Sequence, residues 1–163
     1  MKIIYHCYGQ AHSSVTAANI HLGHLPRQRR ATLAEIYHQP CFDRTLSHQL
    51  GRPQLMGTDE WGHSVYVIGL AGGSRTLRQA VVDFLRLNGV AKGEFLLVNA
   101  LQHAGLPMRI GGYTSRRLGL IWPGRPLSAA GVWLQYRRFL ALVEAVRKRL
   151  DHPWLFQDNE LDR

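Results

Sequence analysis

The stretch MKIIYHCYGQAHSSVTAANIHLGH, residues 1–24, decides the fold expected for this chain. Its apolar start at Ile3 and Ile4 predicts a buried strand, and Gly9 predicts a turn soon after it. The polar residues that follow lead into a helix whose apolar positions begin at Val15. A strand, a glycine turn and a helix form a unit that binds anions, because the first amides of the helix have no acceptor within it. The stretch therefore predicts an α/β protein with an anionic ligand above its first strand.

Strand and helix patterns alternate along the rest of the chain, without internal repeats. Strands are predicted where short apolar runs are flanked by turn residues, at residues 54–56, 64–68 and 94–100. Helices are predicted where apolar residues recur every three or four positions, at residues 75–87 and 128–150. Thr32 and Glu35 have the spacing of a capping box and predict a short helix that ends by Pro40. Residues 108–120 are glycine-rich and basic, and we expect a helix there only after Tyr113.

This alternation predicts a three-layer α/β sandwich, with a mostly parallel sheet and one antiparallel hairpin. Its first strand–loop–helix is expected to be P-loop-like or Rossmann-like. If the first strand and the strand at 94–100 are parallel neighbours, the ligand lies at their carboxyl ends.

Composition predicts one soluble domain over residues 1–163, with about the last 12 residues as a candidate tail. Hydrophobic residues make up 45% of the chain and charged residues 19%, both ordinary for a globular protein. No apolar run approaches the ~20 residues that cross a bilayer, so no membrane partner is expected. The cysteines, Cys7 and Cys41, are too few for a disulfide scaffold, which favours a cytoplasmic location.

The charge is strongly positive and unevenly distributed. The formal net charge is +9, and residues 101–150 contain nine basic side chains against one acid, Glu144. Arginine side chains bind phosphate well through their planar donors. An RNA- or ribosome-associated protein without catalytic activity is therefore an alternative to a ligand-binding protein.

Three interpretations compete for the loop between the first strand and the first helix. A P-loop would need a second glycine and a lysine, which this loop lacks, so a magnesium-dependent nucleotide hydrolase is disfavoured and Mg²⁺ is expected only with a bound nucleotide. Cys7 is a candidate nucleophile below the helix, as in cysteine-dependent phosphatases, although Ser13 stands where those enzymes carry arginine. The third interpretation is anion binding by backbone amides with Ser13 and Ser14, without turnover.

Structural roles are the alternative for each of these side chains. Cys7 is compatible with a small buried residue, and Ser13 or Ser14 with a helix N-cap. The spacing of His21 and His24 permits a pair of metal ligands, but no third ligand is marked out, so no metal site is predicted.

Two further segments are candidates to complete the site. Asp59 and Glu60 are candidate catalytic residues, as a general base or as ligands of a metal–phosphate group, and a turn without catalytic function is the alternative. The second segment combines glycines, hydroxyls and arginines, which suit phosphate binding. Its candidate ligand-binding residues are Arg109, Gly111, Gly112, Ser115, Arg116 and Arg117.

Three blocks of the sequence resemble a bacterial family catalogued as domain of unknown function 3189. They are IIYHCYGQAHSSVTAANIHLG (3–23), MGTDEWGHSVYVIG (56–69) and MRIGGYTSRRLGLIWPGRP (108–126), in the family's order. The similarity extends from Met1 to about Val146 and implies one intact domain. The family pattern places glycine where this chain has Gln10. The resemblance implies no mechanism.

The sequence thus favours a protein that binds a phosphorylated small molecule or a nucleotide, with phosphoryl transfer or phosphate-ester hydrolysis as the compatible reaction. An RNA- or ribosome-associated protein and a partner-binding subunit with a vestigial loop remain alternatives. Cys7 and His12, with Asp59 and Glu60, are the candidate catalytic residues. The first loop supplies the remaining candidate ligand-binding residues: Gly9, Gln10, Ala11, His12, Ser13 and Ser14.

Overall fold

A computed structural model gives the structure of the protein and describes residues 1–45, 49–71, 75–91, 93–116, 118–151 and 160–161. Its described strands form one sheet in the order β2-β3-β1-β4-β5. The central strand β1 runs parallel to β3 on one side and to β4 on the other, whereas β2 is antiparallel to β3. The bounds are β1 Lys2–Cys7, β2 Gln54–Thr58, β3 Ser64–Gly69, β4 Phe95–Asn99 and β5 Glu160–Leu161. The expected mixed α/β fold with one antiparallel hairpin is confirmed.

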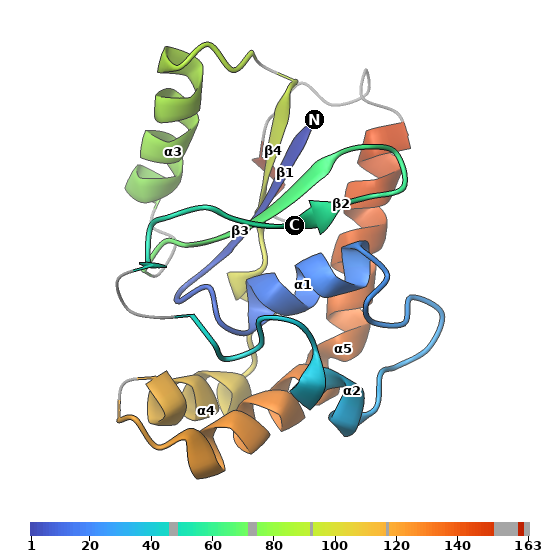
Figure 1. Ribbon diagram of the computed structural model, residues 1–163, viewed down its shortest axis with the longest axis vertical. Helices are drawn as coiled ribbons and strands as arrows, with labels where there is room; N and C mark the ends of the chain where they lie inside the picture. The colour runs from blue at the N-terminus through green and yellow to red at the C-terminus, as the bar shows by residue number, and fades with distance from the viewer. Residues whose placement is uncertain (46–48, 72–74, 92, 117, 152–159, 162–163) are drawn as a thin grey trace.

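Helices lie on both faces of the sheet (Figure 1). Helices α1 (Ser13–His21) and α5 (Ile121–Asp151) cover one face, where Ile3 and Tyr5 of β1 enter the larger core. Helix α3 (Arg75–Leu87) covers the other face and meets Ile4 in a smaller core. Strand β1 is apolar on both faces because both are buried.

Three shorter elements complete the described part of the chain. Helix α2 (Leu33–His38) begins with the predicted capping box, in which the Thr32 side chain accepts from the Glu35 amide. A 3₁₀ turn η2 (Leu101–His103) follows β4 and leads into helix α4 (Leu106–Arg116). Helix α4 lies beyond the carboxyl end of β1 (Figure 1), which places it beside the predicted ligand position.

Helix α4 begins earlier than the sequence suggested. The glycine-rich residues were expected to be irregular as far as Tyr113, but the helix already starts at Leu106. The reason is close packing on α5, because a Cβ at Gly111 would lie 2.5 Å from the Ser128 nitrogen. This contact offsets the helix-propensity cost of glycine, which is about 1 kcal/mol. Pro107 falls in the first turn, where its missing amide is tolerated.

Helix α5 also starts earlier than the predicted Ser128. It extends from Ile121, with a non-helical backbone at Trp122, and includes Pro126. Pro126 lies within the first turns after this break, where its missing amide costs at most one backbone hydrogen bond of the helix. The helical spacing predicts that Trp133, Tyr136, Leu140, Val143 and Val146 face inward. Tyr136, Val143 and Val146 are buried, and Trp133 and Leu140 are partly buried against the same core.

The predicted C-terminal tail falls mostly on residues 152–159 and 162–163, outside the described residues. The short strand β5 pairs in parallel with β4. No described helix is long and apolar enough to cross a membrane.

Candidate phosphate-binding pocket

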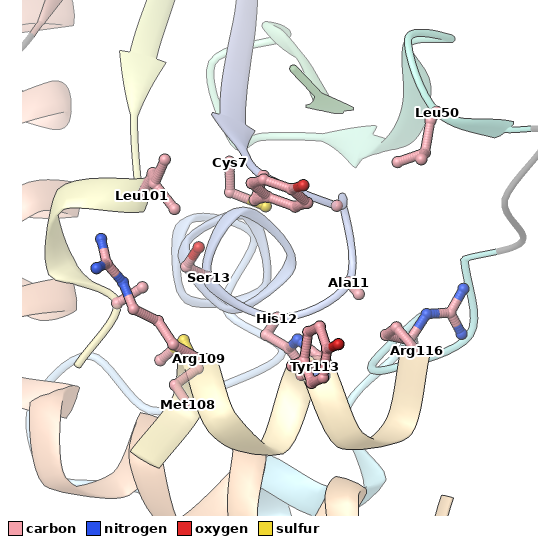
Figure 2. Close-up of a pocket in the computed structure, with 14 residues that line it drawn as sticks. Cys7, Ala11, His12, Ser13, Leu50, Leu101, Met108, Arg109, Tyr113 and Arg116 are labelled. Carbon is pink, nitrogen blue, oxygen red and sulfur yellow. The ribbon is translucent and has the colours of Figure 1, made fainter. Parts of the chain in front are cut away.

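A pocket of about 770 Å³ opens where β1 and β4 end. The loop after β1 and the start of α1 form one side of it, and α4 forms another (Figure 2). Its volume is within the ~300–1,000 Å³ typical of small-molecule sites. Strands β1 and β4 are parallel neighbours, as expected. In such a sheet, ligands bind at the carboxyl ends of the strands, which is where this pocket lies. The lining residues are Cys7, Tyr8, Gly9, Ala11, His12, Ser13, Leu50, Leu101, Ala104, Met108, Arg109, Gly112, Tyr113 and Arg116.

The turn after β1 is held by Gln10, whose side chain is buried away from the pocket. Its backbone φ is +55°, a conformation that favours glycine and that other residues adopt rarely. The Gln10 side-chain oxygen accepts from the Gly69 amide at 3.1 Å, and its nitrogen donates to Gln54 at 3.3 Å. Gln10 thus orients the loop and does not line the pocket.

The start of α1 has no side-chain cap. His12 occupies the N-cap position without a capping hydrogen bond, and both serines lie inside the helix. Among the described residues, no acceptor bonds the backbone amides of Ser13, Ser14 or Val15. The alternative role of Ser13 or Ser14 as an N-cap is therefore wrong. The amides remain free donors beside the pocket, at the positive end of the helix dipole.

Cys7 lies at the end of β1 and lines the pocket. Its sulfur is 3.0 Å from the Ser14 hydroxyl, although only 3% of Cys7 is exposed. Ser13 also lines the pocket, and Figure 2 shows Cys7 and Ser13 at the start of α1. The first loop therefore combines a potential nucleophile with hydrogen-bond donors in one cavity.

Asp43 connects the first loop to α4. Its carboxylate lies 3.1 Å from His12 Nε2 and accepts a hydrogen bond from the Ser115 hydroxyl at 3.1 Å. Arg116 lies 3.9 Å from the same carboxylate and donates to the Asp43 backbone oxygen at 3.3 Å. Burial raises the pKa of Asp43, but His12, Ser115 and Arg116 outweigh it, so the pKa is below its ordinary value. The group is a carboxylate at neutral pH and lies between His12 and Arg116.

Helix α4 brings two of the predicted arginines to the pocket. Arg109 and Arg116 both line it, with Gly112 between them. A Cβ at Gly112 would lie 3.2 Å from the His12 ring, so glycine gives His12 its room. Gly111 packs against α5, and the Ser115 hydroxyl donates to Asp43. These two candidate residues do not line the pocket, and their contacts hold α4 beside it. Arg117 lies outside the described residues.

Asp59 and Glu60 are not among the lining residues. Asp59 is buried in the hairpin turn and accepts hydrogen bonds from His21 Nε2 at 3.1 Å and His63 Nδ1 at 3.0 Å. Glu60 pairs with Arg27 and Arg147 on the surface. The structure therefore separates these carboxylates from the Cys7 pocket and gives both of them other partners.

His21 and His24, which were considered as a pair of metal ligands, form hydrogen bonds with different groups. His21 lies between Tyr5 and Asp59, whereas His24 bonds Asn19 at 3.0 Å. No group of three or more metal-ligating side chains occurs among the described residues.

Sequence reasoning missed several lining residues and the carboxylate behind them. Asp43 lies between the predicted helix that ends by Pro40 and the predicted strand at 54–56, where the sequence pattern indicated no clear element. The structure gives Asp43 a φ of +54°. Tyr8 is next to Cys7 but was not considered, and Leu50 and Leu101 come from remote segments.

The fold and the pocket define a mixed α/β protein with a cationic cavity at the carboxyl edge of its sheet. The chain belongs to the family described as "Protein of unknown function (DUF3189)", whose model matches residues 2–148. No curated protein and no solved structure gives a significant match.

Proposed function

We propose that the protein binds the phosphoryl group of a phosphorylated small molecule at the start of α1. The observation that carries this proposal is the uncapped helix end, whose free amides border a pocket that also contains Arg109 and Arg116. Phosphate needs several donors and a positive charge, and both are available there. The first strand–loop–helix then acts as a P-loop-like cradle in which arginines from α4 replace the missing lysine.

Phosphoryl transfer to Cys7 is the reaction that this arrangement suits. Cys7 gives its thiol proton to water, the thiolate attacks phosphorus, the bond to the ester oxygen breaks, and the alcohol leaves with the proton returned by water. Ser14, at 3.0 Å from the sulfur, is placed to donate a hydrogen bond to the thiolate. Water then attacks the phosphocysteine and releases phosphate. Ser13 occupies the position of the arginine in cysteine-dependent phosphatases, and Arg109 supplies the charge in this proposal.

A thermal-shift titration tests the binding step. Orthophosphate and phosphate monoesters should raise the melting temperature of the wild type beyond the effect of matched sodium chloride. The Ser13→Ala/Ser14→Ala variant keeps the backbone amides and loses the hydroxyls, so it should reduce this shift without abolishing it. Arg109→Ala should also weaken the shift, because it removes a positive charge from the pocket. Arg137→Ala is the matched control, because Arg137 is exposed on α5 and does not line the pocket. An equal loss in Arg137→Ala would show that only the general positive charge matters.

The two alternatives give different results in the same samples. An RNA- or ribosome-associated protein would bind RNA with an affinity that falls steeply with salt. A partner-binding subunit with a vestigial loop would show no anion-specific stabilisation. Either result, without a phosphate effect, would refute the proposed function.

A further inference from the structure

The walls of the pocket are apolar and open to solvent. Tyr8 and Tyr113 line the pocket and are 62% and 59% exposed, and the lining residue Leu50 is 44% exposed. A phosphate ion would leave these side chains in water, because its donors are at the α1 start. The exposed apolar walls therefore point to a ligand with an apolar group attached to its phosphate.

The polar side chains of the pocket are hydroxyls, a thiol, an imidazole and guanidinium groups. The described lining residues include no Asp, Glu, Asn or Gln, which are the side chains that usually bind sugar hydroxyls and the edges of nucleobases. The cationic groups, Arg109 and Arg116, are those assigned to the phosphate. A sugar phosphate or a nucleotide would consequently find no carboxylate or amide side chain for its hydroxyls or its base edge among these residues.

The two tyrosines come from different elements and border the same cavity. Tyr8 directly follows β1, and Tyr113 projects from α4 on the side of the helix that faces the first loop (Figure 2). Met108 and Leu101 add further apolar surface. A planar aromatic ring is the apolar group that suits tyrosine walls, since aromatic pairs gain about 0.5–1.5 kcal/mol beyond the area that they bury. The volume of about 770 Å³ is large enough for a small-molecule ligand.

We infer that the pocket recognises an aryl phosphate, the group found in phenyl phosphate and in the phosphotyrosine side chain. This inference rests on the proposed function, because the phosphate is bound at the start of α1. Tyr8 and Tyr113 determine specificity for the ring, whereas the amides and arginines bind its phosphate.

Calorimetric titrations of the intact protein test the inference with orthophosphate, phenyl phosphate, a phosphotyrosyl peptide, adenosine monophosphate and glucose 6-phosphate. We expect phenyl phosphate to bind about tenfold more tightly than orthophosphate or glucose 6-phosphate. Tyr8→Ala and Tyr113→Ala should each remove much of this preference and leave orthophosphate affinity unchanged. Tyr113→Phe should retain the preference. Phe84→Ala is the control, because Phe84 is an exposed aromatic of α3 that does not line the pocket.

The outcomes separate the two proposals. Orthophosphate binding without an aryl preference, or tighter binding of the nucleotide or sugar phosphate, would overturn the aryl inference and leave the phosphate site standing. Failure of every phosphate compound to bind would overturn the phosphate site and the aryl inference with it. Equal affinity for phenyl phosphate and the peptide indicates a free small molecule, whereas tighter peptide binding indicates a protein-borne group, and both support aryl recognition.

Discussion

Substitution of Asp59 by alanine should lower the free energy of unfolding of the protein without changing its affinity for phosphate. The Asp59 side chain is fully buried and accepts hydrogen bonds from His21, His63 and the Trp61 amide. Burial raises the pKa of Asp59, but hydrogen bonds from His63 and His21 outweigh it, so the pKa is below its ordinary value and the group is a carboxylate. His21 Nε2 therefore donates to it, and Tyr5 donates to His21 Nδ1 at 2.8 Å.

The loss follows from this chain of buried groups. Alanine leaves the fully buried, neutral His21 without its acceptor, and a buried donor left without a partner costs about 1–3 kcal/mol. For a protein of this size, each kcal/mol lowers the melting temperature by roughly 2–4 °C, which gives a fall of about 2–12 °C.

Thermal and urea unfolding measure this change, with Glu60→Ala as the matched control. Glu60 is the next residue in the same turn, but its side chain is 44% exposed, and exposed ion pairs contribute about 0–1 kcal/mol. Calorimetry with orthophosphate on the folded Asp59→Ala protein should give the wild-type affinity. A stable Asp59→Ala variant that no longer binds phosphate would refute the reasoning, because it would assign Asp59 to the site.

Three further predictions test the packing, the titration and the thiol. Gly111→Ala should destabilise the protein by about 1–3 kcal/mol, because its Cβ would collide with the α5 backbone. Gly9→Ala is the control and should unfold like the wild type in urea, because the space around its Cβ is open. Equal stability of the two variants would contradict the close packing of α4 on α5. Burial lowers the pKa of His21 despite the neighbouring Asp59, so His21 binds a proton more readily in the unfolded chain than in the folded protein. The urea midpoint of unfolding should therefore fall as the pH drops below about 6.5. A constant or rising midpoint would be inconsistent with a buried, neutral His21. Iodoacetamide should label Cys7 faster than Cys41 at neutral pH, and orthophosphate should slow the labelling of Cys7; equally slow labelling, monitored by peptide mass spectrometry, would argue against a nucleophilic Cys7.

Local patterns were sufficient for the elements that frame the site. The apolar run, the turn at Gly9 and the polar entry to α1 predict the first strand–loop–helix, because each depends on residues close in sequence. The hairpin between β2 and β3 and the capping box at Thr32 were predictable for the same reason.

Contacts between remote segments were not predictable in this way. Glycines disfavour a helix locally, and α4 forms because Gly111 allows α5 to approach. Asp43 accepts a hydrogen bond from Ser115, which is 72 positions away in sequence, and no local sequence pattern predicts that contact. The carboxylate of Asp59 resembled a catalytic group in sequence, whereas its buried bond to His21 depends on the tertiary fold.

The most direct test of the phosphate site is an NMR titration of the backbone amides with orthophosphate at constant ionic strength. Phosphate binding at the start of α1 should produce saturable downfield proton shifts for the Ser13 and Ser14 amides, which are the free donors there. Shifts confined to exposed arginine-rich surfaces, or no saturable shift at these serines, would contradict it.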